Sequence, residues 1–181
     1  MRRIVAEGAL MILSDKDIRK MLKAKKIVIE PLEEGQIGPA SVDLTLSDEW
    51  YFFKDEYSRK IVDLRETGFQ EAFEMKRAKE ITLKPGELCL GKTLERIKLP
   101  NNVMGKLEGR SRYARMGVII HTTSALVQPG SDNHQVLEIV NLAPFPIKLH
   151  SGMRVSQVVF ELLKSQTGRP YAKFGEIARQ Q

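Results

Sequence analysis

Two features of this 181-residue chain have the residue types and spacing that chemistry requires. The first is the segment of residues 109–117, with the sequence GRSRYARMG, and the second is Glu138, a carboxylate where an apolar strand would carry valine. Arginine guanidinium groups match the geometry of phosphate oxygens, and a carboxylate among apolar residues suits proton transfer. Together they predict a site that holds a polyanionic small molecule by its phosphates and moves protons at its other end.

Residues 109–117 are predicted to form a phosphate-binding turn. Gly109 follows an apolar strand and allows a sharp change of direction, Ser111 is placed to cap a short helix, and Gly117 is a natural left-handed terminator. The N-terminus of a helix presents free N–H groups and partial positive charge, which suit a phosphate oxygen.

The arginines of this turn strengthen the prediction. Arg115 lies one helical turn beyond Ser111, and Arg110 precedes the turn. An ordinary strand-to-helix turn with solvated arginines explains the spacing equally well, and for Arg112 a solvated surface position is the favoured interpretation.

The strand around Glu138 is apolar on both sides in the sequence. One face carries Val136, Glu138 and Val140, and the other carries Leu137 and Ile139. Both faces therefore look buried. Burial in general raises the pKa of a carboxyl group, and raised values serve acid–base catalysis near neutral pH. From the pattern alone, a structural ion pair with one of the arginines is the favoured interpretation.

Metal chemistry is also weighed. His134 shares a strand face with Glu138, and His121 lies on another strand, so a two-histidine, one-carboxylate site is conceivable. The single Cys89 excludes an intramolecular disulfide and a thiolate zinc site, and the zinc deaminase signature is absent. We expect no zinc.

The composition is typical of a globular protein, with 42% hydrophobic and 29% charged residues. The net charge of +6 is concentrated in residues 104–121 and 164–181, as expected for a protein that binds polyanions. No apolar run is long enough to cross a bilayer, so we expect a cytoplasmic protein. One domain is predicted at residues 11–181, with residues 1–10 as a possible N-terminal extension.

Many short apolar runs separated by glycine and proline predict an all-β fold, a distorted antiparallel jelly roll, sandwich or barrel. A helix is predicted over residues 15–25, with Ser14 as its N-cap, and a second over 66–78. The predicted strands are 27–29, 41–46, 61–64, 81–83, 87–94, 103–107, 118–122, 135–140, 147–149 and 154–162.

Several segments resemble, in order, those of deoxycytidine triphosphate (dCTP) deaminases. They lie between residue 11 and about residue 174, and they are MILSDKDI (11–18), GPASVDLTL (38–46), PGE (85–87), GRS with AR and G (109–117), His121 with Thr123, PG (129–130), VLEI (136–139) and PY (170–171).

The resemblance implies a dUTPase-like fold, a homotrimer with nucleotide sites between subunits, and hydrolysis of dCTP to dUTP and ammonia in pyrimidine deoxynucleotide biosynthesis. It implies that Glu138 is the general base and acid, and that Ser111 and a backbone carbonyl near Ser124 orient the attacking water. The triphosphate, as its magnesium complex, would be held by Arg110, Ser111 and Arg115. The remaining nucleotide-binding candidates are Arg112, Thr123, Gln128, Val136, Leu137, Tyr171 and Lys173.

The chain departs from the family pattern at several positions. Gln128 stands where dUTPases and bifunctional members carry an aspartate, and a neutral amide cannot act as the base for attack on a phosphate. Leu126, Ser131 and Ser124 also differ, as does the spacing of the tail from Lys173. These changes bear on base selectivity and lid closure more than on the fold.

Three other functions remain open from the sequence. A dUTP pyrophosphatase or a bifunctional enzyme forming dUMP is one, and Gln128 argues against it. A non-catalytic nucleotide-binding or nucleic-acid-binding β-domain that uses the same basic surface is another. A cupin-like metalloenzyme is the third. The favoured partner is a free nucleotide, with neither nucleic acid nor membrane.

Overall fold

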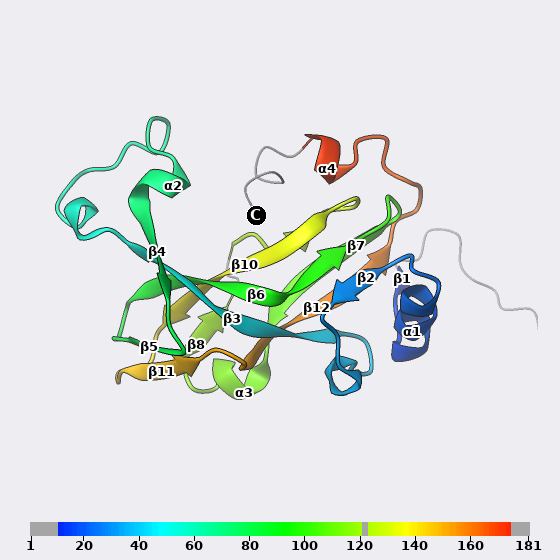
Figure 1. Ribbon diagram of the computed structural model, residues 1–181, viewed down its shortest axis with the longest axis horizontal. Coiled ribbons are helices and arrows are strands. Elements are labelled where there is room, and N and C mark those ends of the chain that lie inside the picture. The colour runs from blue at the N-terminus through cyan, green and yellow to red at the C-terminus, as the bar shows by residue number, and fades with distance from the viewer. Residues whose placement is uncertain (1–10, 121–122, 175–181) are drawn as a thin grey trace, which may run out of the picture.

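Alternation of inward and outward side chains gives this chain a curled antiparallel sheet, which confirms the predicted, mainly β fold class (Figure 1). The structure is a computed structural model that describes residues 11–120 and 123–174, so the possible extension at residues 1–10 lies outside it. The strands are β1 (Met11–Ile12), β2 (Val28–Glu30), β3 (Val42–Phe53), β4 (Phe73–Arg77), β5 (Glu80–Leu83), β6 (Leu88–Lys98), β7 (Val103–Gly109), β8 (Val118–Ile120), β9 (Leu126–Val127), β10 (Asp132–Asn141), β11 (Ile147–His150) and β12 (Arg154–Leu162).

The main sheet has the strand order β8-β10-β6-β3-β12-β7-β9. β1 pairs with β12, β2 with β6 and β4 with β3, while β5 and β11 form a separate two-stranded sheet. The sheet curls around a core in which Trp50 and Phe160 are fully buried. β10 shows the underlying pattern best, because its residues alternate between buried and half-buried along the whole strand.

The N-terminal helix, α1 (Asp15–Lys23), begins as predicted and ends two residues earlier. Ser14 caps it, since its side chain accepts a hydrogen bond from the backbone N–H of Asp17. Ile18 is the buried residue of the helix and anchors it to the core. No helix in the described part of the chain is both long and apolar enough to span a membrane.

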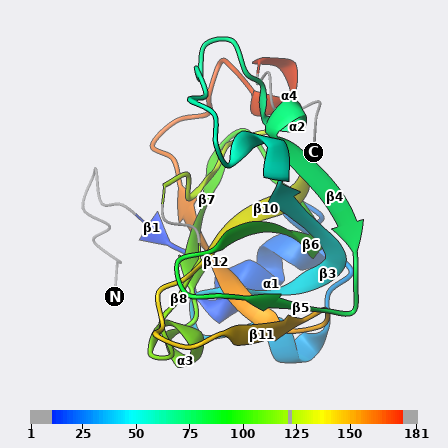
Figure 2. The ribbon, with the colours of Figure 1, turned by 90° about the vertical axis from the view of Figure 1, so that its left-hand side faces the viewer.

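An arm projects from the sheet between β3 and β4, and here two predictions are wrong (Figures 1 and 2). Residues 61–64 do not form a strand, and Ile61 and Leu64 are exposed because no neighbouring strand covers them. The predicted helix over 66–78 is reduced to α2 (Phe69–Ala72). From Phe73 the chain forms β4 instead, because pairing with β3 supplies its hydrogen bonds.

A cavity of about 930 Å³ lies beneath this arm. Its lining is rich in aromatic side chains, and the ring of Phe73 packs in a tilted geometry against those of Phe53 and Phe69, with centroid distances of 4.1 and 5.1 Å. The described lining residues include none of the site residues predicted from the sequence. This cavity is therefore separate from the candidate chemistry.

Cys89 lies in β6 with its side chain fully buried. Burial, with a smaller contribution from the charge of Glu87, raises the pKa of its thiol to about 12. We therefore expect no reaction with a thiol reagent at pH 8 in the folded protein, and one thiol per chain after unfolding in guanidinium, measured by mass spectrometry. Rapid labelling of the folded protein would contradict this burial.

Candidate active site

The phosphate-binding turn predicted at residues 109–117, hereafter the α3 turn, follows directly from β7. Its helix, α3 (Ser111–Ala114), is a single turn. Arg110 is the N-cap residue, so the prediction that Ser111 caps the helix is wrong, and Ser111 is instead the first helical residue. Gly117 has a φ of +80°, and a Cβ there would lie 2.8 Å from the backbone nitrogen of Ala143, so the predicted left-handed glycine is confirmed.

The arginines of the α3 turn differ in their surroundings. Arg110 is half-buried: its Nη2 lies 3.2 Å from Oδ2 of Asp43, and its Nη1 donates to the carbonyl oxygen of Arg154 at 3.1 Å. Arg115 is exposed at the end of the helix, and Ser111 is exposed at its start. The guanidinium of Arg112 lies over the ring of Tyr113, 5.9 Å from its centroid. Ser111 and Arg115 are thus open to a ligand.

Asp43 is a charged neighbour of this turn that sequence reasoning missed. Burial raises the pKa of Asp43 above its usual value, and the nearby charges of Arg110 and Arg154 oppose that rise. The only signal in the sequence was an aspartate inside the apolar run of β3, and such a signal does not identify its partner.

A second group of predicted residues gathers around the turn before β10. Gly130 has a φ of +78°, and the backbone of this turn binds the C-terminal helix α4 (Tyr171–Phe174). Tyr171 N–H donates to the carbonyl of Pro129 at 3.0 Å, and Ala172 N–H to that of Gly130 at 3.3 Å. The structure therefore brings Tyr171 beside Gln128 and its turn. Lys173 is exposed on the same helix, and the predicted residues Thr123 and Ser124 are exposed before β9.

Glu138 lies on β10, opposite Leu90 of β6. Leu137 and Ile139 point into the core, whereas Val136, Glu138 and Val140 are only half-buried. The prediction that both faces are buried is wrong, because the second face is partly open to solvent in the single chain. The Oε2 atom of Glu138 is nevertheless shielded from solvent. The carboxylate is thus partly desolvated on a face that a ligand or another chain can approach.

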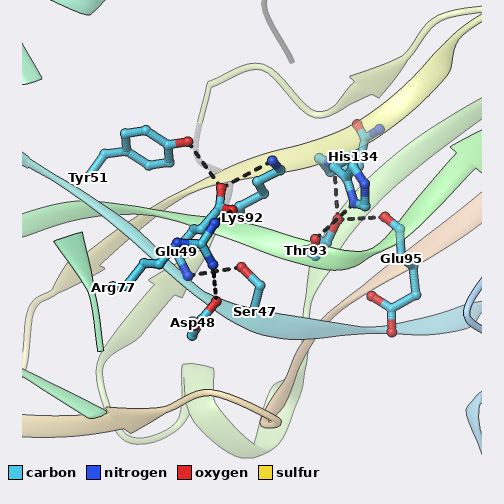
Figure 3. Close-up of polar contacts among 10 residues, drawn as sticks. Ser47, Asp48, Glu49, Tyr51, Arg77, Lys92, Thr93, Glu95 and His134 are labelled. Carbon is cyan, nitrogen blue, oxygen red and sulfur yellow. Dashed lines mark hydrogen bonds and ion pairs between the residues drawn. The ribbon is translucent and has the colours of Figure 1, made fainter. Parts of the chain in front are cut away.

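A charged network lies on the neighbouring strands (Figure 3). Glu49 accepts hydrogen bonds from Lys92 Nζ at 3.1 Å, Arg77 Nη2 at 2.5 Å and the Tyr51 hydroxyl at 3.4 Å. Burial raises the pKa of Glu49, but the hydrogen bond and the charges of Lys92 and Arg77 outweigh it and hold that pKa below its usual value. Tyr51 pairs with Leu90, which in turn pairs with Glu138, so this network borders the face of the candidate base.

Among the carboxylates of the described residues, Glu95 is the most buried, and sequence reasoning missed it. Its side chain is 1% exposed, and its oxygens accept hydrogen bonds from Gln36 Nε2 at 2.7 Å and from the backbone N–H of Thr45 at 2.8 Å. The predicted strand ended at residue 94, so Glu95 fell outside the pattern, although it continues the inward alternation of Thr93. Glu95 is thus satisfied by neutral donors inside the core.

His134 is a candidate ligand of the predicted metal site. His134 shares the half-open face of β10 with Glu138, but its Nδ1 lies 3.1 Å from the carbonyl oxygen of Thr93. Its predicted partner His121 lies outside the described residues. Within residues 11–120 and 123–174, no cluster of three or more histidine, cysteine, aspartate or glutamate side chains could hold a metal ion.

Two groups of the predicted site residues lie at opposite ends of the sheet. The α3 turn lies at one end and α4 with Tyr171 at the other, with the sheet between them (Figures 1 and 2). A single chain therefore does not bring Ser111 and Arg115 to Tyr171 and Lys173.

Comparison with known proteins gives a consistent result. A family model described as dCTP deaminase-like matches residues 12–163. Similar proteins include one from Dictyoglomus turgidum, 40% identical over 90% of this chain and 86% of its own length, and one from Methanosphaera stadtmanae, 38% identical over 88% and 83%. Both are named "dCTP deaminase, dUMP-forming".

Solved structures support the fold alone. The 2'-deoxycytidine 5'-triphosphate deaminase of Agrobacterium tumefaciens matches with a TM-score of 0.67 and 22% identity, over 84% of this chain. This chain spans about half of that protein's length, since the match covers 48% of it. A dUTPase of the Staphylococcus aureus phage phi11 matches with a TM-score of 0.50 and 14% identity, over 83% of this chain.

Proposed function

Because the chain belongs to the dCTP deaminase-like family, we propose that it removes the amino group of dCTP by hydrolysis, with Glu138 as the residue that moves the protons. The observation that carries this proposal is the position of Glu138. It is a carboxylate within the apolar segment 136–140 of β10, with one oxygen shielded from solvent on a half-open face. General acid–base catalysis needs a positioned group that reaches the substrate without full hydration.

In the proposed reaction, water attacks C4 of the cytosine ring. Glu138 accepts a proton from this water and delivers it to the ring nitrogen N3, which gives a tetrahedral intermediate. A second proton, taken from the new hydroxyl and passed to the amino group, lets ammonia leave and forms the uracil carbonyl. The hydroxyl of Ser111 and a backbone carbonyl near Ser124 orient the water in this proposal, and both residues are exposed to an incoming ligand.

The triphosphate is proposed to bind the α3 turn through Arg110, Ser111 and Arg115. Tyr171 and Lys173 belong to α4, which lies at the far end of the sheet from the α3 turn, so we propose that they contact the nucleotide from another copy of the chain. A homotrimer with sites between subunits accounts for the separation of the two groups.

Magnesium is proposed to arrive with the nucleotide. The described residues hold no cluster of three metal-ligating side chains, and Asp43, the carboxylate beside the α3 turn, is paired with Arg110. This donor set fits a cation held mainly by phosphate oxygens, whose charge it would neutralise. The chemistry at the ring is proposed to need no zinc.

A second candidate function is continuation to dUMP, favoured by the names of the similar proteins. That step releases pyrophosphate and needs a base for attack on the phosphate. Gln128 lies at the turn beside Tyr171, where a neutral amide binds a sugar hydroxyl but cannot take that proton. The first step is therefore proposed as the main activity, and the second as slower.

Product analysis tests both proposals. After incubation with dCTP and magnesium, we expect ammonia in excess of pyrophosphate at early times, with dUTP accumulating. The variant Gln128→Asp is expected to raise the ratio of pyrophosphate to ammonia. Equal release of the two by the unaltered protein would establish the dUMP-forming reaction, and no ammonia at all would refute the deaminase assignment.

A further inference from the structure

Residues 38–46 are a family-like segment that has no part in the proposed reaction. They include the start of β3, and two of their side chains make contacts beside the α3 turn: Asp43 with Arg110, and Ser41 with Gln157 of β12. The contacts that they make explain how an arginine on a one-turn helix can be held in a fixed position.

The first contact fixes the guanidinium of Arg110. Asp43 binds Nη2, while the carbonyl oxygen of Arg154 binds Nη1, at 3.2 and 3.1 Å. Two contacts on different nitrogens fix both the position and the plane of the group. The Asp43 side chain is 17% exposed and that of Arg110 is 37% exposed, so the pair is screened less by water than a surface pair, while part of Arg110 still faces solvent.

The second contact fixes the backbone from which Arg110 extends. The hydroxyl of Ser41 donates to Oε1 of Gln157 at 2.7 Å, and Nε2 of Gln157 donates to the carbonyl oxygen of Gly109 at 3.3 Å. The N–H of Arg110 itself donates to Val155 at 3.2 Å. Gly109 and Arg110 are thus both hydrogen-bonded to β12.

Asp43 is in turn fixed from the core. Gln36, at the end of the short 3-10 helix η1 (Glu34–Gln36), donates through Nε2 to the backbone carbonyl of Asp43 at 2.9 Å and to Glu95 at 2.7 Å. Glu95 also accepts from Thr45, two residues beyond Asp43. A continuous network therefore runs from a buried carboxylate to the guanidinium of Arg110.

We propose that Asp43 is a positioning residue for triphosphate binding, which holds Arg110 in the orientation that receives the phosphates, with Ser41 and Gln157 as the second tether. This rests on the proposed function of the α3 turn. An arginine fixed before the ligand arrives loses little side-chain entropy on binding, so affinity for the triphosphate rises without any contact between Asp43 and the nucleotide.

A double-mutant cycle on the full chain tests the proposal. Asp43→Asn keeps the shape and removes the charge, and we expect it to raise KM for dCTP about tenfold with kcat within about twofold. In the Arg110→Ala background, Asp43→Asn should add nothing further, because the residue through which it acts is gone. Asp48→Asn is the matched control: Asp48 is on the same strand and pairs with an arginine at 3.1 Å, but that arginine, Arg77, belongs to β4 and not to the α3 turn. It should leave KM unchanged.

The binding of inorganic tripolyphosphate, measured by calorimetry, separates this inference from the proposed reaction. Loss of tripolyphosphate affinity in Asp43→Asn, with no ammonia from dCTP in any variant, would support the positioning role and refute the deaminase. Normal deamination with unchanged KM and tripolyphosphate affinity, or effects of Asp43→Asn and Arg110→Ala that simply add, would overturn the positioning role. Should Asp43→Asn not fold, Gln157→Met decides: a KM raised several-fold supports the proposal, and an unchanged KM overturns it.

Discussion

Ammonia release from dCTP should fall by about a thousandfold in Glu138→Gln, with nucleotide binding retained. The amide has nearly the shape of the carboxylate, so β10 and its pairing with β6 should persist, since Leu137 and Ile139 supply the core contacts. An amide cannot accept the proton of the attacking water, which removes the proposed route while leaving the phosphate contacts in place. Initial rates of ammonia formation and dCTP binding by calorimetry measure the two properties separately.

A carboxylate on the separate β5–β11 sheet serves as the comparison. Glu80→Gln removes a charge from a surface pair with Lys148, whose Nζ lies 2.7 Å from Glu80 Oε1, and it should deaminate at the unaltered rate. Wild-type turnover in Glu138→Gln would remove the central residue of the proposed mechanism. Loss of dCTP binding along with turnover would assign Glu138 to binding rather than proton transfer.

The fold was largely predictable because its signals are local. Alternating apolar residues identified most of the strands, and the Ser14 cap identified the first helix. The predictions for the arm between β3 and β4 were wrong because strand pairing there, or the lack of it, overrides the local sequence pattern. The run at 61–64 is apolar but finds no partner strand, and Phe73 joins β3 although the preceding residues favour a helix.

The site was less predictable because it depends on contacts between distant segments. Asp43 and Arg110 are far apart in the sequence, and Glu95 is joined to Gln36 across 59 residues. The periodicity of apolar residues along one element carries no information about contacts between distant segments. Glu138 was correctly placed on a strand, but the openness of its face follows from how the sheet curls, which the pattern of one strand does not determine.

Replacement of Arg115 by glutamine should raise KM for dCTP by about thirtyfold and change kcat much less. Arg115 is exposed at the end of α3, one turn beyond Ser111, so its guanidinium is available to the triphosphate. The local structure should survive, because the turn is closed by backbone hydrogen bonds from Arg115 to Ser111 and from Gly117 to Ala114. Steady-state kinetics on dCTP measure both parameters.

Arg112→Gln gives the sharpest comparison, since it removes the same group from the same one-turn helix. The guanidinium of Arg112 lies over the ring of Tyr113, so we expect its loss to change KM by less than about threefold. Competition by tripolyphosphate should weaken in parallel with KM in Arg115→Gln, because both report the phosphate contact. Equal effects of the two substitutions would show that the turn binds through its total charge rather than through one directed arginine. In that case, added salt should weaken dCTP binding by both variants to the same extent.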